Sequence, residues 1–529
     1  MKEQKRILTS LLVLLALTGA QAQQAAPVPK LVVTVVIDQL RSDYLEAFSP
    51  LYLPSGLRRF MEQGRVYADG EYPVASPDLA SATASLYTGT VPYDHGVIAQ
   101  KWLDRNTLRP IYCVDDLTYQ GVNTSDASSP KYLGVSTLGD ELKVATEGKG
   151  LVYAIAPYRD AAILSAGHSA DGAFWIDDET GKWCTTSFYS PVLPSWVSMR
   201  NNAQPQDFIR KLVYQPCSEI VGNFNYFAAG GMKTPFEHKF SKEEHPWQTY
   251  KSCALVNEEV TKLAQNCLNN SAVGIDQVTD FLAITYYAGN YNHESVTTNP
   301  IEMQDTYVRL DGCIYDLLET IDRRVGLDNA IVVLTSSGTV EEAVEDLSPY
   351  KIPTGTFYIN RTSALLNMYF MAQFGQGNYV EAVYGNQIYL NHKLLEDKQL
   401  NIVDAEERAQ EFLLQCAGVK DVYTSQRLLL GAWTPGISRL RNAYNPKCSG
   451  DIFIEVAPGW KLLNEDLQTS SQVRASYVSF PIVFLGYGIE SKKEYATTSV
   501  DVIVPTLAHY MRIRAPNACS TRPLNDIRR

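Results

Sequence analysis

The sequence predicts an α/β fold in which a central, mostly parallel sheet is covered by helices on both faces. Residues 31–37 form a nearly continuous β-branched run that ends at Asp38, which is typical of a strand buried on both faces. Similar short apolar runs recur at 151–155, 281–286, 330–334 and 480–485. Between such runs, apolar residues recur at helical spacing, most clearly over 301–325. Alternating strands and helices of this kind favour a parallel sheet with helices on both faces.

The amino-terminal segment has the composition of a secretory signal peptide. Residues 1–6 are mostly charged, 7–17 are mostly apolar, and small residues follow up to Ala22. The apolar stretch is shorter than the ~20 residues that span a bilayer, and no later run reaches ~18 residues. We therefore expect residues 1–22 to be removed from an exported protein without a transmembrane segment. Its location would be the periplasm, the outer-membrane surface or the outside of the cell.

Residues 23–529 are expected to form one domain with two cap insertions, at about 170–278 and about 340–470. Both stretches are less periodic than the rest of the chain and richer in Tyr, Trp, Asn and Pro. We expect them to fold over the carboxyl ends of the strands, because open α/β sheets place their binding sites there.

Charge and cysteine content exclude two classes of function. With 46 Lys and Arg against 58 Asp and Glu, the net charge is −12, and the longest basic runs are doublets, which argues against nucleic-acid binding. The nine cysteines contain no C-x-x-C pair, so a structural zinc site is not expected. Their odd number leaves at least one thiol without a partner in the chain.

Six segments, spread over the chain in a fixed order, carry a resemblance to a known family. They are 36–45 (VIDQLRSDYL), 87–96 (YTGTVPYDHG), 166–175 (AGHSADGAFW), 305–311 (DTYVRLD), 386–391 (NQIYLN), and 504–507 (VPTL) with 516–519 (PNAC). Together they resemble the alkaline phosphatase superfamily, and most closely its secreted bacterial phosphate-monoesterase branch. The resemblance implies two zinc ions, held by Asp and His side chains at the strand ends, and a Thr or Ser nucleophile.

Most positions that the resemblance assigns to chemistry carry other residue types here. Asp38 matches the first metal ligand, but the nucleophile position falls on Leu79, which has no group to attack phosphorus. The other metal positions fall on Asn290, Glu294, Ser337, Gly338 and Ser479. The phosphate-binding positions fall on Gln100, Tyr158 and Asp160, where the resemblance implies Asn, Lys and Arg.

Each candidate residue also has a structural interpretation. Asp38 could instead cap the helix after its strand, and His293, one residue out of register with a ligand position, could be a solvated loop residue. A replacement nucleophile could come from Ser81, Thr83 or Ser85, although a structural role in a helix starting near Pro77 is favoured. A structural role is also favoured for His95 and His168.

The main hypothesis is an exported, catalytically inactive phosphatase-like protein that binds another envelope protein and needs no cofactor. The alternative is an active, metal-dependent hydrolase of phosphate esters that holds zinc with substituted ligands. A third possibility is a module that binds carbohydrate or lipid headgroups in the same cleft, for which the aromatic insertions are the only support.

Overall fold

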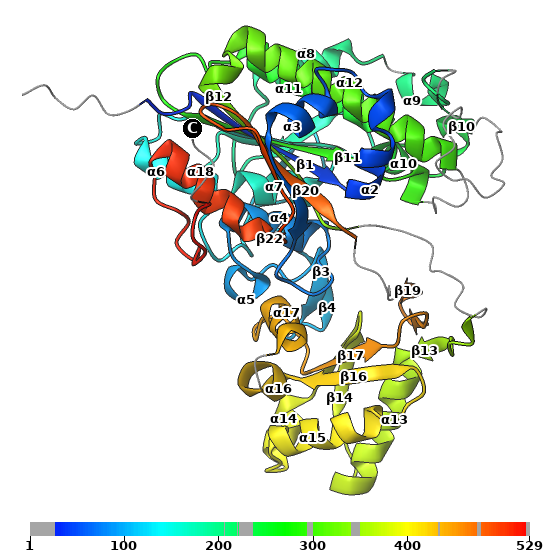
Figure 1. Cartoon of the computed structure of the whole chain (residues 1–529). Coiled ribbons are helices and arrows are strands. Elements are labelled where there is room, and N and C mark those ends of the chain that lie inside the picture. The colour runs from blue at the N-terminus through cyan, green and yellow to red at the C-terminus, as the bar shows by residue number, and fades with distance from the viewer. Residues whose placement is uncertain are drawn as a thin grey trace, which may run out of the picture.

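The structure is a computed structural model. It describes residues 27–205, 207–218, 221, 236–293, 300–339, 350–431, 434–472 and 478–524. The described residues form a main body around a large sheet and a small lobe, which contains the residues from 356 to 472 (Figure 1).

Parallel strands form the centre of the large sheet. β1 (Leu31–Asp38) lies between β11 (Asp280–Tyr287) and β12 (Ala330–Ser336), and both neighbours run parallel to it. Beyond β11, β6 (Val152–Ile155) and β7 (Gly172–Ile176) continue the parallel arrangement. All eight residues of β1 are buried, as its apolar sequence predicts. The predicted mostly parallel sheet is therefore confirmed.

The edges of the sheet are antiparallel or mixed. β20 (Phe480–Gly486) runs antiparallel to β12, and β2 (Arg65–Glu71) runs antiparallel to β20. The remaining strands of this sheet in the described residues are β5 (Gly121–Val122), β8 (Trp183–Thr186), β21 (Lys492–Glu494) and β22 (Thr498–Ser499). A separate hairpin is formed by β3 (Lys101–Asp104) and β4 (Arg109–Tyr112).

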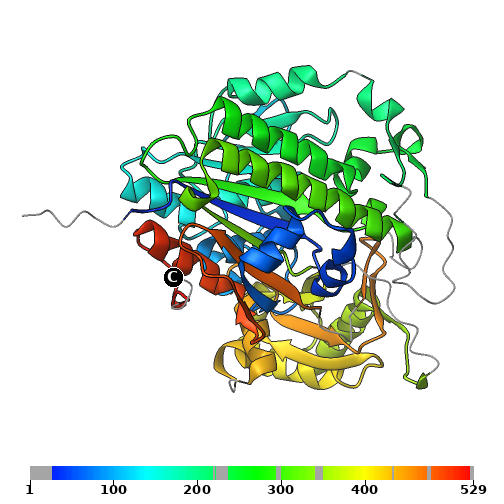
Figure 2. The ribbon, with the colours of Figure 1, turned by 45° about the horizontal axis from the view of Figure 1, so that its top comes forward.

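Helices cover both faces because alternate residues of a strand point to opposite sides. Val33 and Val35 join the core under one set of helices, whereas Val32 and Val36 join the core under the other. The first set comprises α2 (Ser42–Ala47), α3 (Leu57–Gln63), α8 (Ser195–Ala203), α9 (Phe208–Lys211), α10 (Pro246–Lys251), α11 (Leu255–Asn270) and α12 (Pro300–Arg324). The second comprises α4 (Leu79–Thr88), α6 (Leu138–Ala145), α7 (Arg159–Ala166) and α18 (Ile503–Met511). Figure 2 shows the long helices α11 and α12 on one face and α18 on the other.

The segment 170–278 is partly a component of the sheet and partly a helical layer. β7 and β8 lie within it and extend the central sheet. The helices from α8 to α11 follow and pack on the face that also carries α12. The boundary expected from composition therefore falls inside the sheet, because β7 and β8 contain two of the four Trp residues of this segment.

The small lobe has its own sheets and its own hydrophobic core. Its four-stranded sheet has the order β14-β15-β17-β16, and a three-stranded sheet has the order β13-β18-β19. The strands are β13 (Thr356–Tyr358), β14 (Val380–Tyr384), β15 (Gln387–Leu390), β16 (Val419–Thr424), β17 (Ile452–Val456), β18 (Lys461–Asn464) and β19 (Thr469–Gln472). The helices are α13 (Ile359–Phe374), α14 (His392–Asp397), α15 (Ile402–Leu413), α16 (Ser425–Leu430) and α17 (Pro435–Ala443). Figures 1 and 2 both show this lobe on the side of the main body away from α11 and α12.

All nine cysteines are free thiols in the described residues, and five of them are buried. Burial raises the pKa of the Cys253 and Cys267 thiols, the latter to about 12. Among the described helices, none combines the length and the apolar character needed to cross a membrane.

Candidate functional site

The candidate site lies where β1, β11 and β12 end, because the carboxyl ends of parallel strands meet at one edge of a sheet. Asp38 is the last residue of β1 and is only 5% exposed. Its Oδ1 accepts a hydrogen bond from Ser337 Oγ at 2.6 Å and another from Thr339 Oγ1 at 2.7 Å. Hydroxyl donors thus contact the carboxylate that the resemblance assigns to a metal.

The structure places Asp38 and Ser337 together, as expected, and adds a residue that the sequence analysis missed. Thr339 follows β12 by three residues, in the segment that also contains Ser337. A run of hydroxyl residues directly after a buried strand is the signal that could have identified it. Asp38 does not cap the next helix, since α2 begins at Ser42 and its N-cap is Arg41.

Gly338 leaves no room for a side chain at a position that the resemblance assigns to a histidine. Its φ is +70°, and a Cβ atom there would lie 2.6 Å from Cδ2 of Tyr72. The Tyr72 ring is buried, and its hydroxyl donates to the Ser336 carbonyl oxygen at 3.0 Å. The backbone and the fixed ring therefore both oppose a histidine at this position.

The loop after β11 carries a buried amide and an exposed imidazole. Asn290 is 4% exposed, and neither its Oδ1 nor its Nδ2 has a hydrogen-bond partner among the described residues. His293 Nδ1 lies 3.4 Å from Gln39 Nε2 and 3.3 Å from the Tyr287 hydroxyl. The expected position Glu294 lies outside the described residues.

The position expected for the nucleophile begins a well-capped helix. Asp78 is the N-cap of α4, and Leu79 is the first residue of that helix. The Asp78 carboxylate accepts bonds from Ser81 N at 2.9 Å and from Ser81 Oγ at 2.8 Å. Thr83 Oγ1 donates to the Leu79 carbonyl oxygen at 2.6 Å. The hydroxyls near Leu79 therefore stabilise the helix turn itself.

Ser85 also has a structural partner rather than a base. His95 Nε2 lies 3.0 Å from Ser85 Oγ, while His95 Nδ1 accepts a hydrogen bond from Val97 N. The acceptor role of Nδ1 places the proton of the neutral ring on Nε2, which then donates to Ser85. Burial lowers the pKa of His95 to about 3, so the ring stays neutral and cannot take the serine proton.

His168 is held by acceptors on both sides of its ring. Its Nδ1 lies 3.1 Å from Asp140 Oδ2, and its Nε2 lies 3.0 Å from the Leu133 carbonyl oxygen. Two oxygen acceptors require two N–H groups, so this geometry favours the charged imidazolium. The hydrogen bond to Asp140 raises the pKa of His168. Its role is to join α6 to the loop after α7.

Carboxylates occupy the region where phosphate-binding groups are implied. Gln100 N donates to Asp78 Oδ2 at 2.5 Å, and Gln100 Nε2 donates to Asp160 Oδ2 at 3.0 Å. Asp160 is fully buried, and burial, together with the nearby charge of Asp160, raises the pKa of Asp78. Tyr158 donates instead to the Lys251 carbonyl oxygen at 3.1 Å.

Arg159, the cation next to Asp160 in the chain, bonds to groups other than Gln100 and Asp78. Arg159 donates to Asp115 Oδ1 at 2.9 Å and to Ser128 Oγ at 3.1 Å. Because Asp78 and Asp160 flank Gln100 and this guanidinium bonds to other groups, the local charge opposes an anionic ligand.

Ser479 takes part in a backbone contact rather than in the contacts of Asp38. Its Oγ donates to the Ala68 carbonyl oxygen at 3.2 Å, and its own carbonyl oxygen accepts from Ser42 N at 2.9 Å. These bonds join the start of β20 to β2 and α2.

The described donors do not fit two zinc ions. Each zinc ion needs about four N, S or O ligands, and imidazole and thiolate are the preferred ones besides carboxylate. The described positions offer one carboxylate, one amide and two hydroxyl groups at Asp38, Asn290, Ser337 and Ser479. Across the described residues, no three His, Cys, Asp or Glu side chains form a group that could hold a metal.

Comparisons with known proteins agree with the architecture. The family model for type I phosphodiesterase / nucleotide pyrophosphatase matches residues 32–478. The chain is 30% identical over 550 residues to the alkaline phosphatase PafA of Elizabethkingia meningoseptica, covering 99% of each chain. It is also 30% identical over 518 residues to a protein of Myroides odoratus named calcium-transporting ATPase, covering 94% of each. The crystal structure of wild-type PafA matches with a TM-score of 0.82 and 27% identity, over 96% of this chain and 100% of that one.

Proposed function

Although this chain belongs to the type I phosphodiesterase / nucleotide pyrophosphatase family, in the PafA-like branch of the alkaline phosphatase superfamily, we propose that it is a non-hydrolytic binding protein. In this proposal the family fold is kept as a scaffold, and the cleft no longer transfers phosphoryl groups. The protein is exported through its signal peptide and acts as a subunit of a cell-envelope complex with another protein.

One observation supports the proposal most strongly: Leu79 occupies the start of α4, directly after the capping residue Asp78. A leucine side chain has no lone pair to attack phosphorus. The hydroxyls of Ser81 and Ser85 are engaged within the fold, and Asp78 and Asp160 oppose an anionic substrate.

A phosphatase assay with added zinc tests this proposal. The purified mature chain and its Asp38→Ala variant are incubated with p-nitrophenyl phosphate and zinc, with the Elizabethkingia enzyme as the positive control. We expect no zinc-dependent turnover by the wild type above that of Asp38→Ala. Zinc-dependent turnover that disappears in Asp38→Ala would refute the proposal.

A second candidate is a metal-dependent phosphoric ester hydrolase that binds its metal with substituted ligands. The comparisons favour this candidate, since the similar proteins are named as alkaline phosphatases and an ATPase. Retention of Asp38 also favours it. Metal analysis of protein purified with zinc separates the candidates, because this one requires bound metal that falls in Asp38→Ala.

The partner is tested by purification from the native envelope. A tagged chain should co-purify one envelope protein in a fixed ratio that survives a second column. Recovery of the chain alone, at the same yield and from the same membranes, would argue against a complex.

A further inference from the structure

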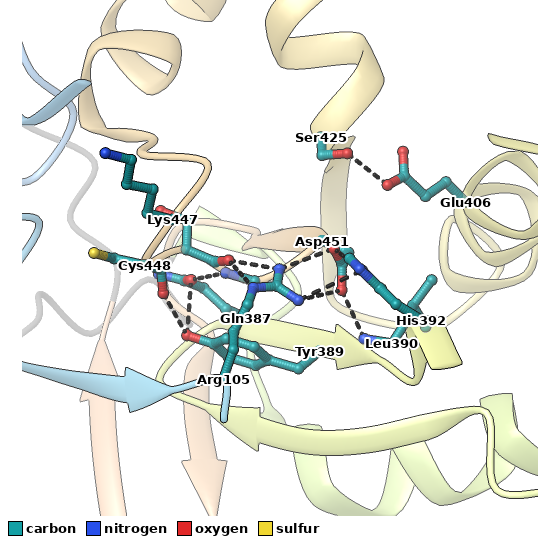
Figure 3. Close-up of polar contacts among 12 residues, drawn as sticks. Arg105, Gln387, Tyr389, Leu390, His392, Glu406, Ser425, Lys447, Cys448 and Asp451 are labelled. Carbon is teal, nitrogen blue, oxygen red and sulfur yellow. Dashed lines mark hydrogen bonds and ion pairs between the residues drawn. The ribbon is translucent and has the colours of Figure 1, made fainter. Parts of the chain in front are cut away.

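Arg105, at the tip of the β3–β4 hairpin, joins the main body to the small lobe. Its Nη2 donates to Asp451 Oδ1 at 2.9 Å, and its Nη1 lies 3.3 Å from Oδ2 of the same carboxylate. Arg105 also donates from Nη2 to the Ser449 carbonyl oxygen at 2.7 Å. Figure 3 shows this guanidinium between Asp451 and the segment that carries Lys447 and Cys448. A two-point contact of this kind fixes orientation as well as distance.

Asp451 directly precedes β17, and its carboxylate bonds to two other elements of the small lobe, β15 and α14. Its side chain is 4% exposed. It accepts a hydrogen bond from Leu390 N at 2.7 Å, at the end of β15, and from His392 Nε2 at 2.8 Å, at the start of α14. The hydrogen bond to Asp451 raises the pKa of His392, against the effects of burial and of the Arg105 charge. A buried carboxylate with four such donors is a rigid anchor.

Other contacts of the lobe in the described residues fall on segments that flank α4. Asn442 Nδ2 donates to the Pro73 carbonyl oxygen at 2.7 Å, and Ala75 N donates to the Arg439 carbonyl oxygen at 3.1 Å. On the other side of α4, Asn445 Nδ2 donates to the Tyr93 carbonyl oxygen at 3.0 Å. The lobe therefore contacts the chain just before and just after the helix that begins at Leu79.

The hairpin connects the Arg105 contact with the candidate site. Lys101 begins β3, and Gln100 immediately precedes it at the base of the hairpin. Gln100 N and Nε2 bond to Asp78 and Asp160. The tip of one short hairpin thus lies at the small lobe while its base contacts the carboxylates of Asp78 and Asp160.

We infer that the Arg105–Asp451 pair is an interlobe latch that fixes the β3–β4 hairpin and, through it, the Asp78–Gln100–Asp160 contacts at the base of the hairpin. When the lobe is docked, the latch holds Gln100 between the two carboxylates. When the lobe is released, the hairpin and the Gln100 contacts loosen together. This coupling goes beyond the proposed function and does not depend on it.

Hydrogen–deuterium exchange of the full mature chain tests the latch. Arg105→Ala removes the guanidinium from a partly exposed hairpin tip. Arg361→Ala is the matched control, because the Arg361–Glu465 pair joins two exposed residues within the small lobe. We expect the Gln100 amide and residues 78–82 to exchange about tenfold faster in Arg105→Ala, as loss of a charge-assisted hydrogen bond predicts. The control should match the wild type.

The residues at which exchange becomes faster decide whether the inference holds. If exchange accelerates only at residues 104–109, the pair is a local contact of the hairpin tip and the inference is wrong. The same holds if Arg361→Ala accelerates exchange at Gln100 as much as Arg105→Ala does.

Asp451→Asn provides a second test from the lobe side. This variant keeps an oxygen acceptor for the amide of Leu390, but it removes the charge and replaces the oxygen that faces Arg105 and His392 with an NH2 donor. Circular dichroism first checks that the lobe is folded. With a folded lobe, the Gln100 amide should again exchange several times faster than in the wild type, and an unchanged rate would overturn the inference. If the lobe unfolds, Gln100 should exchange at least as fast as in Arg105→Ala, and protection there would overturn it too.

Discussion

Gly338 shows how a single residue can determine which chemistry a site admits. Its positive φ costs an L-residue about 1–2 kcal/mol, and contact of a Cβ with Tyr72 adds the cost of overpacking, about 1–3 kcal/mol. Both costs arise from the Cβ alone, so they apply to any side chain that replaces glycine.

We predict that Gly338→Ala lowers the free energy of unfolding by about 3 kcal/mol. Gly385→Ala is the control, since Gly385 has φ of +57° and, apart from its own atoms and its chain neighbours, no described atom lies within 4 Å of the point where its Cβ would be. It should lose only about 1 kcal/mol. Urea denaturation measures both values. Equal losses of unfolding free energy in the two variants would mean that the Tyr72 ring moves aside at no cost and does not block a side chain at 338.

A second residue-scale prediction concerns His168. Its pKa is raised in the folded state by Asp140, so protonation stabilises the fold. This contribution is complete below the pKa of the unfolded chain and is lost as the pH rises through the folded pKa. The ring is 38% exposed, so solvent screening limits the effect to less than about 1 kcal/mol.

His168→Gln isolates this effect. The difference in unfolding free energy between the wild type and the variant should be larger at pH 5.5 than at pH 9. A difference that is constant across this pH range would show that the imidazolium does not contribute to the stability of the fold.

At the scale of elements, β11 contains a carboxyl group whose titration opposes folding. Asp280 begins this strand, and its oxygens accept bonds from Leu151 N and Gly274 N, both at 2.7 Å. Burial raises its pKa to about 6. Between about pH 4 and pH 6 the folded chain therefore binds more protons than the unfolded chain, and stability falls as the pH rises.

We predict that this group contributes a loss of roughly 2–3 kcal/mol between pH 4 and pH 6.5. The slope is measured as the difference between the wild type and Asp280→Asn in urea denaturation at each pH. Because the amide does not titrate, the wild type should lose stability relative to the variant as the pH rises. A gain instead would contradict the raised pKa.

The elements were predictable where the signal is local. β1 and α12 lie within one residue of the runs 31–37 and 301–325, because two-sided burial and helical spacing both leave short repeating patterns. The antiparallel direction of β20 was not predictable, since an apolar run carries no direction. The independent core of the small lobe was also missed, because its aromatic residues are spread over many short elements.

The candidate site was predictable only where its residues follow recognisable strands. Asp38 and Ser337 meet because both follow buried parallel strands, which the sequence indicates. The Arg105–Asp451 pair could not be found in this way, since the two residues are 346 positions apart and neither lies in a recognisable motif.

In the part of the chain that the structure describes, the molecule consists of a main body and a small lobe joined largely by polar contacts. The small lobe has a hydrophobic core of its own, and Ala443 and Cys448 are the partly buried residues of its described 439–451 segment that pack against the main core. Interfaces of this type permit separate unfolding of the two parts.

We predict that calorimetry of the mature chain shows at least two transitions. Arg105→Ala should separate them further, because it weakens the contact between the lobes, whereas Arg361→Ala should leave their separation unchanged. A single transition with equal calorimetric and van't Hoff enthalpies would show that the molecule unfolds as one unit.

The free thiols described in the fold have a consequence for how this protein can be made. Five of the nine are buried, and no two of these nine described residues are bonded, so we expect folding to need no oxidant and no disulfide isomerase. Thiolate formation is suppressed where burial raises the thiol pKa, so these sulfurs react slowly once the chain is folded. The thiols are therefore most open to oxidation and mispairing before folding, when all nine are accessible. Expression of the mature chain in a reducing cytosol should yield the same fold as export, and with less mispairing.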